Sequence, residues 1–192
     1  YHGNNLDAVE KLNALSRHIC SSHPAPEEAM QWLDEVRKSI PYYSIPVYLL
    51  GNFLGALGFA MLFGCGSVDM LMSGICGILG GLLNRFMDRM KVNPFFETIF
   101  SAFFMALTAY GLNTLGIVKN VNSVVIGALM ILVPGLLFTN AMRDIIYGDT
   151  NSGITRFVQV LLISMGMALG TAVAWNTASL LWGIPKNLES LT

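Results

Sequence analysis

The chain has 192 residues, of which 54% are hydrophobic and only 12% charged, and its formal net charge is −1. A soluble domain carries about 25% charged residues, and several long segments here have few or none, so the composition indicates a multi-pass membrane protein. The near-neutral charge and the lack of a basic block argue against a nucleic-acid partner. The three cysteines and three histidines form no complete ligand cluster, so we predict no metal site and no cofactor.

Residues 1–44 are expected to be cytoplasmic or interfacial. Apolar residues recur every three or four positions between Leu6 and Ile19, which is typical of an amphipathic helix. Pro26, followed by two glutamates, predicts the start of a second helix that stops at Pro41. We expect a short cytoplasmic helical hairpin that packs on the membrane domain.

Residues 45–182 are predicted to form an all-α bundle of five transmembrane helices, followed by a short polar tail, residues 183–192. The spans are expected at about 46–64, 68–83, 95–112, 122–149 and 154–175, the last with 182 as a later end, and a basic loop is expected at 84–91. Asn151 or Ser152 is a candidate cap for the last helix. Three glycine pairs spaced four residues apart, at 51/55, 77/81 and 166/170, favour close helix packing.

Lysine and arginine predict the orientation of the chain in the membrane. With the N-terminus inside, nine of the eleven basic residues fall on the inner side. Only Lys119 and Lys186 fall outside. Five spans then place the N-terminus in the cytoplasm and the C-terminus outside.

The fourth span is interrupted by Pro134-Gly135. Proline lacks a backbone N–H, so the helix should kink or divide there, and interrupted spans mark the binding sites of transporters. A straight descent would put Pro134 about 18 Å into the membrane. A second half-helix would aim its N–H groups at a substrate carboxylate, assisted by Thr139, Asn140 and Asn52. The alternative is an ordinary kinked span.

Charged residues near the span ends are candidates for a gate or for ion coupling. They are Arg143, Asp144, Asp149 and Glu97. The alternative for these residues, and for Asp69, is an interfacial position. No acid or histidine falls at the middle of a span, and no catalytic motif is present, so we do not predict an enzyme.

The segment after the break resembles the signature of the threonine/serine exporter family. The matching residues are Leu132-Val-Pro-Gly135, Thr139-Asn140, Arg143-Asp144, Gly148-Asp149, Ser152-Gly153 and Arg156. The opening Gly3-Asn4-Asn5-Leu6 and Leu15-Ser16-Arg17 are also similar to the family's segment before its first span. The family's upstream segment with a Thr-x-Arg-x-Glu-like motif is expected to be missing here.

This resemblance implies an inner-membrane exporter of small carboxylate-bearing metabolites, either threonine and serine or dicarboxylates such as succinate. It also implies the five-span half of a larger transporter, whose second half would be a separate membrane subunit, with a homo-oligomer as a further option. We therefore predict a transporter subunit that works by alternating access. The alternative is a non-transporting scaffold or anchoring subunit.

Overall fold

A computed structural model describes residues 5–40 and 44–183, and within these ranges it is helical without strands. The elements are α1 (Leu6–Ser22), α2 (Pro26–Ser39), α3 (Ile45–Leu62), α4 (Ser67–Arg89), α5 (Pro94–Thr114), α6 (Val121–Leu129), the 3₁₀ helix η1 (Met130–Leu132), α7 (Gly135–Ile146) and α8 (Thr150–Trp182). The chain divides into two compact units, Tyr1–Ser44 and Ile45–Thr192. The all-helical prediction is confirmed.

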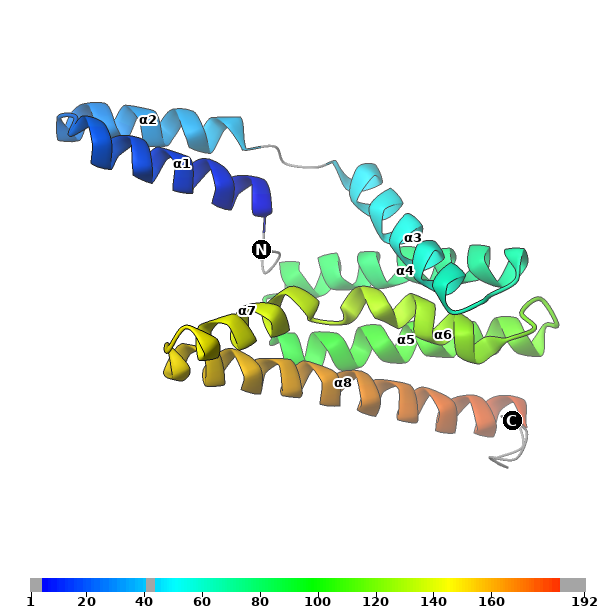
Figure 1. The fold of residues 1–192 in the computed structure, drawn as a ribbon. Coiled ribbons are helices and arrows are strands. Elements are labelled where there is room, and N and C mark those ends of the chain that lie inside the picture. The colour runs from blue at the N-terminus through cyan, green and yellow to red at the C-terminus, as the bar shows by residue number, and fades with distance from the viewer. Residues whose placement is uncertain (1–4, 41–43, 184–192) are drawn as a thin grey trace. The chain divides into compact units, whose positions relative to one another are not determined.

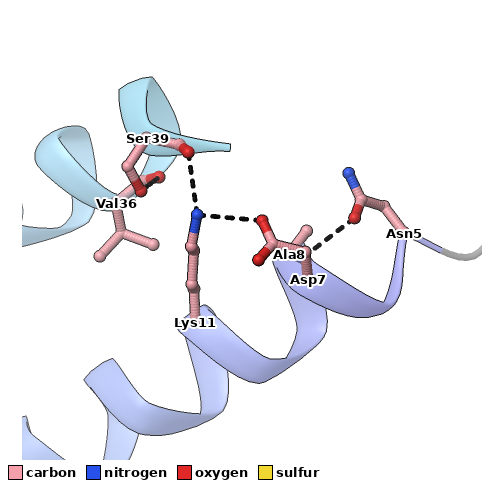
Figure 2. Close-up of polar contacts among 6 residues, drawn as sticks. All are labelled: Asn5, Asp7, Ala8, Lys11, Val36 and Ser39. Atoms are coloured by element: carbon pink, nitrogen blue, oxygen red, sulfur yellow. Dashed lines mark hydrogen bonds and ion pairs between the residues drawn. The ribbon is translucent and has the colours of Figure 1, made fainter. Parts of the chain in front are cut away.

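The first unit is a helical hairpin held by polar contacts at its open end. The Asn5 side chain caps α1 by accepting a hydrogen bond from the Ala8 N–H at 3.1 Å. Lys11 Nζ lies 3.0 Å from an Asp7 carboxylate oxygen and donates to the Ser39 carbonyl of α2 at 2.9 Å. Figure 2 shows Lys11 bridging the two helices.

The other end of this hairpin is a tight turn. His23 adopts a left-handed conformation with φ 46°, and Pro26 occupies the first turn of α2. Between the two ends, the rings of His18 and Trp32 lie 4.7 Å apart, and Leu15 is buried. The two predicted helices are therefore present. Pro41, predicted to end the second helix, and residues 184–192 of the predicted tail lie outside the described residues.

The second unit contains the membrane-spanning helices. In the described ranges, α3, α4, α5 and α8 are each long and apolar enough to cross a membrane, and α6–η1 together with α7 makes a fifth, bent candidate (Figure 1). The bend between these two halves is 55°. The predicted helical break at Pro134-Gly135 is confirmed, and the described helices supply four candidate spans, or five if the bent pair is one span.

Helix α4 is longer than predicted. The segment from Asn84 to Arg89, expected to be part of a basic loop, continues the helix. Asn84 accepts a 2.6 Å hydrogen bond from the Ser101 hydroxyl of α5, which ties this polar extension to its neighbour. Arginine and methionine also favour helices. The connection to α5 is thereby reduced to residues 90–93, in which Lys91 has φ 53°.

Glycine governs how closely these helices pack. A Cβ built at Gly77 would lie 2.7 Å from the Ala56 Cβ of α3, and one at Gly170 would lie 2.5 Å from the Ile99 carbonyl oxygen of α5. Two of the three predicted pairs, 77/81 and 166/170, therefore sit at close contacts. The prediction for the third pair is wrong. A Cβ built at Gly51 would meet no atom of another segment within 4 Å, and one at Gly55 would meet only the Ile131 side chain, at 3.9 Å. That face of α3 is open.

The helices of this unit surround a core of mostly small side chains. α5 packs along α8 and α4, and α6 packs against α3, α4 and α5. The core includes Cys76, Met105, Val124, Ala128 and Ala174. This packing fixes α6 at the centre of the unit, whereas α7 has α8 as its main neighbour.

Candidate binding site at the broken helix

The break is made by Val133 and Pro134, which lie between η1 and α7, and by Gly135, which begins α7. The 3₁₀ helix ends where the Val133 N–H donates to the Met130 carbonyl at 3.3 Å. Pro134 has no N–H to donate, and the Gly135 N–H turns back to the Val133 carbonyl at 2.8 Å. The helical ladder is interrupted at this point, and the chain leaves in a new direction.

The amino end of α7 is uncapped. Pro134 occupies the N-cap position and makes no side-chain hydrogen bond to the helix, whereas Asn93, Asn120 and Asp149 cap α5, α6 and α8. The first hydrogen bond spanning four residues in α7 runs from the Phe138 N–H to the Pro134 carbonyl, at 2.9 Å. The N–H groups of Leu136 and Leu137 precede it and lack acceptors within α7. They lie at the positive end of the helix dipole.

Two predicted polar residues lie just behind this helix end. The Thr139 hydroxyl donates to the Gly135 carbonyl at 3.0 Å, and its oxygen retains the capacity to accept. Asn140 is half-buried, and among the described residues its amide makes no side-chain hydrogen bond. Both side chains thus belong to the first two turns of α7.

Asn52 lies near the other side of the break. Its Nδ2 donates to the Tyr48 carbonyl at 2.8 Å, and its side chain packs on Gly81 of α4. A Cβ built at Gly77 would lie 2.8 Å from the Asn52 carbonyl oxygen and 3.1 Å from the Ile131 Cδ1. Asn52 and Ile131 of η1 therefore contact the same residue of α4, Gly77, whereas Thr139 and Asn140 are part of α7.

The predicted gate residues gather at the turn between α7 and α8. Asp144 forms a 2.8 Å ion pair with Arg156, which joins the two helices. The Arg143 guanidinium lies 5.7 Å from the centre of the Tyr147 ring. Asp149 caps α8 through the Ser152 N–H at 3.4 Å, so the cap is Asp149 and not the predicted Asn151 or Ser152, because α8 begins at Thr150.

Glu97 lies apart from this turn. It is half-buried in the first turn of α5, where the residue makes an interaction of its own. The predicted gate set is therefore divided between the turn of α7 and α8 and the amino end of α5.

α7 lies beside the first turns of α8, beyond the region where α8 meets α5. Gly153 packs against Ile145 and the Ala141 carbonyl of α7, whereas contact with the Phe95 carbonyl of α5 occurs at Gly166. Figure 1 shows α7 and the start of α8 extending past the ends of α4 and α5. With 33 residues, α8 is about 50 Å long and exceeds a hydrocarbon core of about 30 Å. The straight descent assumed for the fourth span is not adopted, because α7 bends by 55° from α6 and η1.

Sequence analysis did not identify the polar contacts on the inner face of α4. Asp69, expected at an interface, is buried with 4% exposure, and Ser73 is fully buried one turn further along. The Ser73 hydroxyl lies 3.3 Å from the carbonyl oxygens of Ala56 and Val124. The signal in the sequence is the spacing of Asp69, Ser73 and Asn84 along the glycine-rich face of α4.

Comparison with known proteins gives a consistent result. The family model described as "Putative threonine/serine exporter" (ThrE) matches residues 1–178. A "Threonine/serine exporter" of Corynebacterium glutamicum is 25% identical over 190 residues, which cover 97% of this chain and 39% of that protein. A "Probable threonine/serine exporter" of Mycobacterium tuberculosis is 22% identical over 166 residues, covering 86% and 31%. The chain thus spans well under half the length of these relatives, and no solved structure matches it significantly.

Proposed function

The chain belongs to the threonine/serine exporter family, and we propose that this multi-pass membrane protein forms part of an exporter of small amino acids such as threonine and serine. The names of its relatives support the amino-acid class. Dicarboxylates such as succinate are the alternative substrates, because they present the same carboxylate group. Members of this family are transporters, and we propose no catalytic activity for the chain.

The observation that carries the proposal is the uncapped amino end of α7 next to the break. The free N–H groups of Leu136 and Leu137 suit a carboxylate, as helix amino ends suit anions generally. The last carbonyls of η1, on the other side of Pro134, suit an ammonium group. A break that offers both kinds of group fits the zwitterion of an amino acid better than a dicarboxylate.

Side chains around the break would then orient and gate the substrate. Thr139 and Asn140 would hydrogen-bond it from α7, and Asn52 from the side of α3. The Asp144–Arg156 ion pair would hold α7 against α8 in one state and open in another, with Arg143, Asp149 and Glu97 assisting in gating or coupling. Because the break allows α7 to move without α6, alternating access would proceed by rotation of α7 away from α8 when this ion pair opens.

The complete exporter would need more than this chain. The relatives are more than twice as long, so we propose a second membrane half, carried by a separate subunit, with a homo-oligomer as the alternative assembly. We further propose an inner-membrane location with the N-terminus in the cytoplasm and the C-terminus outside, which follows from the distribution of lysine and arginine.

Efflux of labelled threonine, serine and succinate from preloaded proteoliposomes tests this proposal. The chain alone, the chain with a candidate second half, and the pair carrying Pro134→Ala or Asn140→Ala should be compared. We expect efflux of amino acids by the pair and a loss of about tenfold or more in Pro134→Ala, since hydrogen bonds to a charged ligand are lost. Asn140→Ala should mainly raise KM.

Pro46→Ala is the matched control, because Pro46 is exposed in the first turn of α3, remote from any break, and its replacement should leave efflux unchanged. Wild-type efflux by both site variants would remove the binding site from the break. Absence of efflux with the second half confirmed present would instead favour a non-transporting scaffold.

A further inference from the structure

Asp69 is a buried carboxylate in the first turn of α4, and it is the one charged side chain buried below a tenth exposure in the described residues. One carboxylate oxygen accepts the Lys119 N–H at 3.0 Å, and the other accepts the Asn120 N–H at 3.1 Å. These two residues immediately precede α6. Asp69 therefore holds the chain at the point where the broken span begins.

The local chemistry makes this contact strong. A buried carboxylate is costly unless it is hydrogen-bonded, and each of its two oxygens has a backbone donor here. The amino end of α4 has no side-chain cap, and a negative charge in its first turn interacts favourably with the helix dipole. Asp69 thus stabilises the start of α4 and the start of α6 together.

The same face of α4 contacts α6 and η1 at two further positions along the helix. One turn beyond Asp69, Ser73 contacts the Val124 carbonyl of α6. One turn beyond Ser73, Gly77 lies against the Ile131 side chain of η1. The chain from residue 119 to residue 131 is therefore aligned along α4, up to three residues before Pro134.

We propose that Asp69 is a positioning residue for the exporter: by fixing the start of α6 it sets the height at which the break at Pro134-Gly135 meets α3 and α4. α6 and η1 together are helical and transmit a displacement at their start to the break. Loss of the two hydrogen bonds shifts the break against Asn52 and weakens substrate binding. The transport part of this inference rests on the proposed function, whereas the contact itself does not.

The test replaces Asp69 by asparagine, which keeps the size of the side chain but turns one acceptor into a donor that faces an N–H. Hydrogen exchange of the purified full chain should show the Lys119 and Asn120 amides exchanging about tenfold to a hundredfold faster, the usual range for a lost bond to a charged acceptor. Asp88→Asn, the same change at the other end of α4, is the control and should leave both amides unaffected. Unchanged exchange in Asp69→Asn overturns the proposal.

The second readout is efflux by the chain with its second half. Positioning predicts that Asp69→Asn raises KM several-fold and that Asp69→Glu, which restores the charge, recovers part of the change. A purely structural role would lower Vmax in proportion to the folded protein lost and leave KM unchanged. Faster amide exchange with an unchanged KM overturns the positioning role. If the amides exchange faster in Asp69→Asn but the wild-type pair exports no substrate, the contact made by Asp69 is supported and the proposed transport function fails.

Discussion

The two halves of the broken span are held in opposite ways. α6 packs against three helices, and four of its nine residues are buried, namely Val124, Val125, Gly127 and Ala128. α7 packs mainly on α8, and of its twelve residues only Ala141 is buried. The remaining faces of α7 expose large apolar side chains, with Ile146 at 76%. The bent pair thus contains a closely packed half, α6, and a half held mainly by one neighbour, α7.

This difference follows from what surrounds the break. Gly127 of α6 lets α3 approach its backbone, and Asp69 and Ser73 of α4 add polar contacts. α7 has one glycine contact, at Gly153 of α8, and one ion pair with the same helix. Because the break removes the hydrogen bonds that would couple the halves, α7 is the half whose position can change at low cost.

Replacing Gly127 by leucine should have the largest effect, because Gly127 is buried in α6, the closely packed half of the broken span. A Cβ at this position would lie 2.8 Å from the Cα and Cβ of Ala60, so α3 and α6 would have to separate. We expect a destabilisation of about 3 kcal/mol or complete loss of folded protein. Thermal unfolding in detergent measures it.

Gly51→Leu is the matched control, because a Cβ built at Gly51 would meet no atom of another segment within 4 Å. It should unfold at the wild-type temperature. Equal loss in both variants would mean that added bulk in general, and not the closeness of α3 and α6, destabilises the protein.

Ser73→Ala should have a smaller effect on the same half. The change removes the hydroxyl that lies between the Ala56 and Val124 carbonyls, and interhelical hydrogen bonds in membrane proteins contribute about 1 kcal/mol. Denaturant or thermal unfolding should show this loss. Thr108→Ala on α5 serves for comparison, because that hydroxyl bonds only within its own helix, to the Phe104 carbonyl, and an equal loss there would contradict a special role for Ser73.

The pH dependence of Cys65 labelling reports on the contact between α4 and α6. Burial raises the pKa of this loop thiol, the Asp69 carboxylate raises that pKa further, and a hydrogen bond with Ser123 of α6 opposes them. Since the thiolate is the reactive form, alkylation of Cys65 should be slower than that of an ordinary thiol at pH 8, and its rate should keep rising above the ordinary pKa. Peptide-resolved mass spectrometry measures the rate.

In Asp69→Asn the second cause of the raised pKa is removed, so the midpoint of Cys65 labelling should move to lower pH. A midpoint that stays in place would show that Asp69 and Cys65 are farther apart in the membrane than this structure has them.

Asp144→Ala should have the smallest effect on stability. The ion pair with Arg156 is partly exposed, with 23% and 44% of the two side chains accessible, and such pairs contribute about 1 kcal/mol or less. We expect an unfolding temperature close to wild type but faster proteolysis or hydrogen exchange in α7. The reverse result, a large fall in stability with α7 unchanged, would show that α7 is not the loosely held half.

The sequence by itself determined the class of the protein and the position of its break. Long apolar segments with few charges require helices in a bilayer, and proline at residue 134 cannot continue a helical ladder, so both features follow from local chemistry. The span ends were predicted within a few residues except at α4, whose polar end looked like a loop and is helical because Asn84 bonds to Ser101. The sequence also showed which residues near the break are polar.

Only the tertiary structure decided how those residues are grouped. The sequence predicts an interfacial position for Asp69. Its burial depends on a loop that lies 50 residues further along the chain. In the same way, Asn52 of α3 packs on α4, whereas Thr139 and Asn140 belong to α7, which packs on α8. Contacts between distant segments depend on which small residues meet, and a single sequence does not specify those pairings.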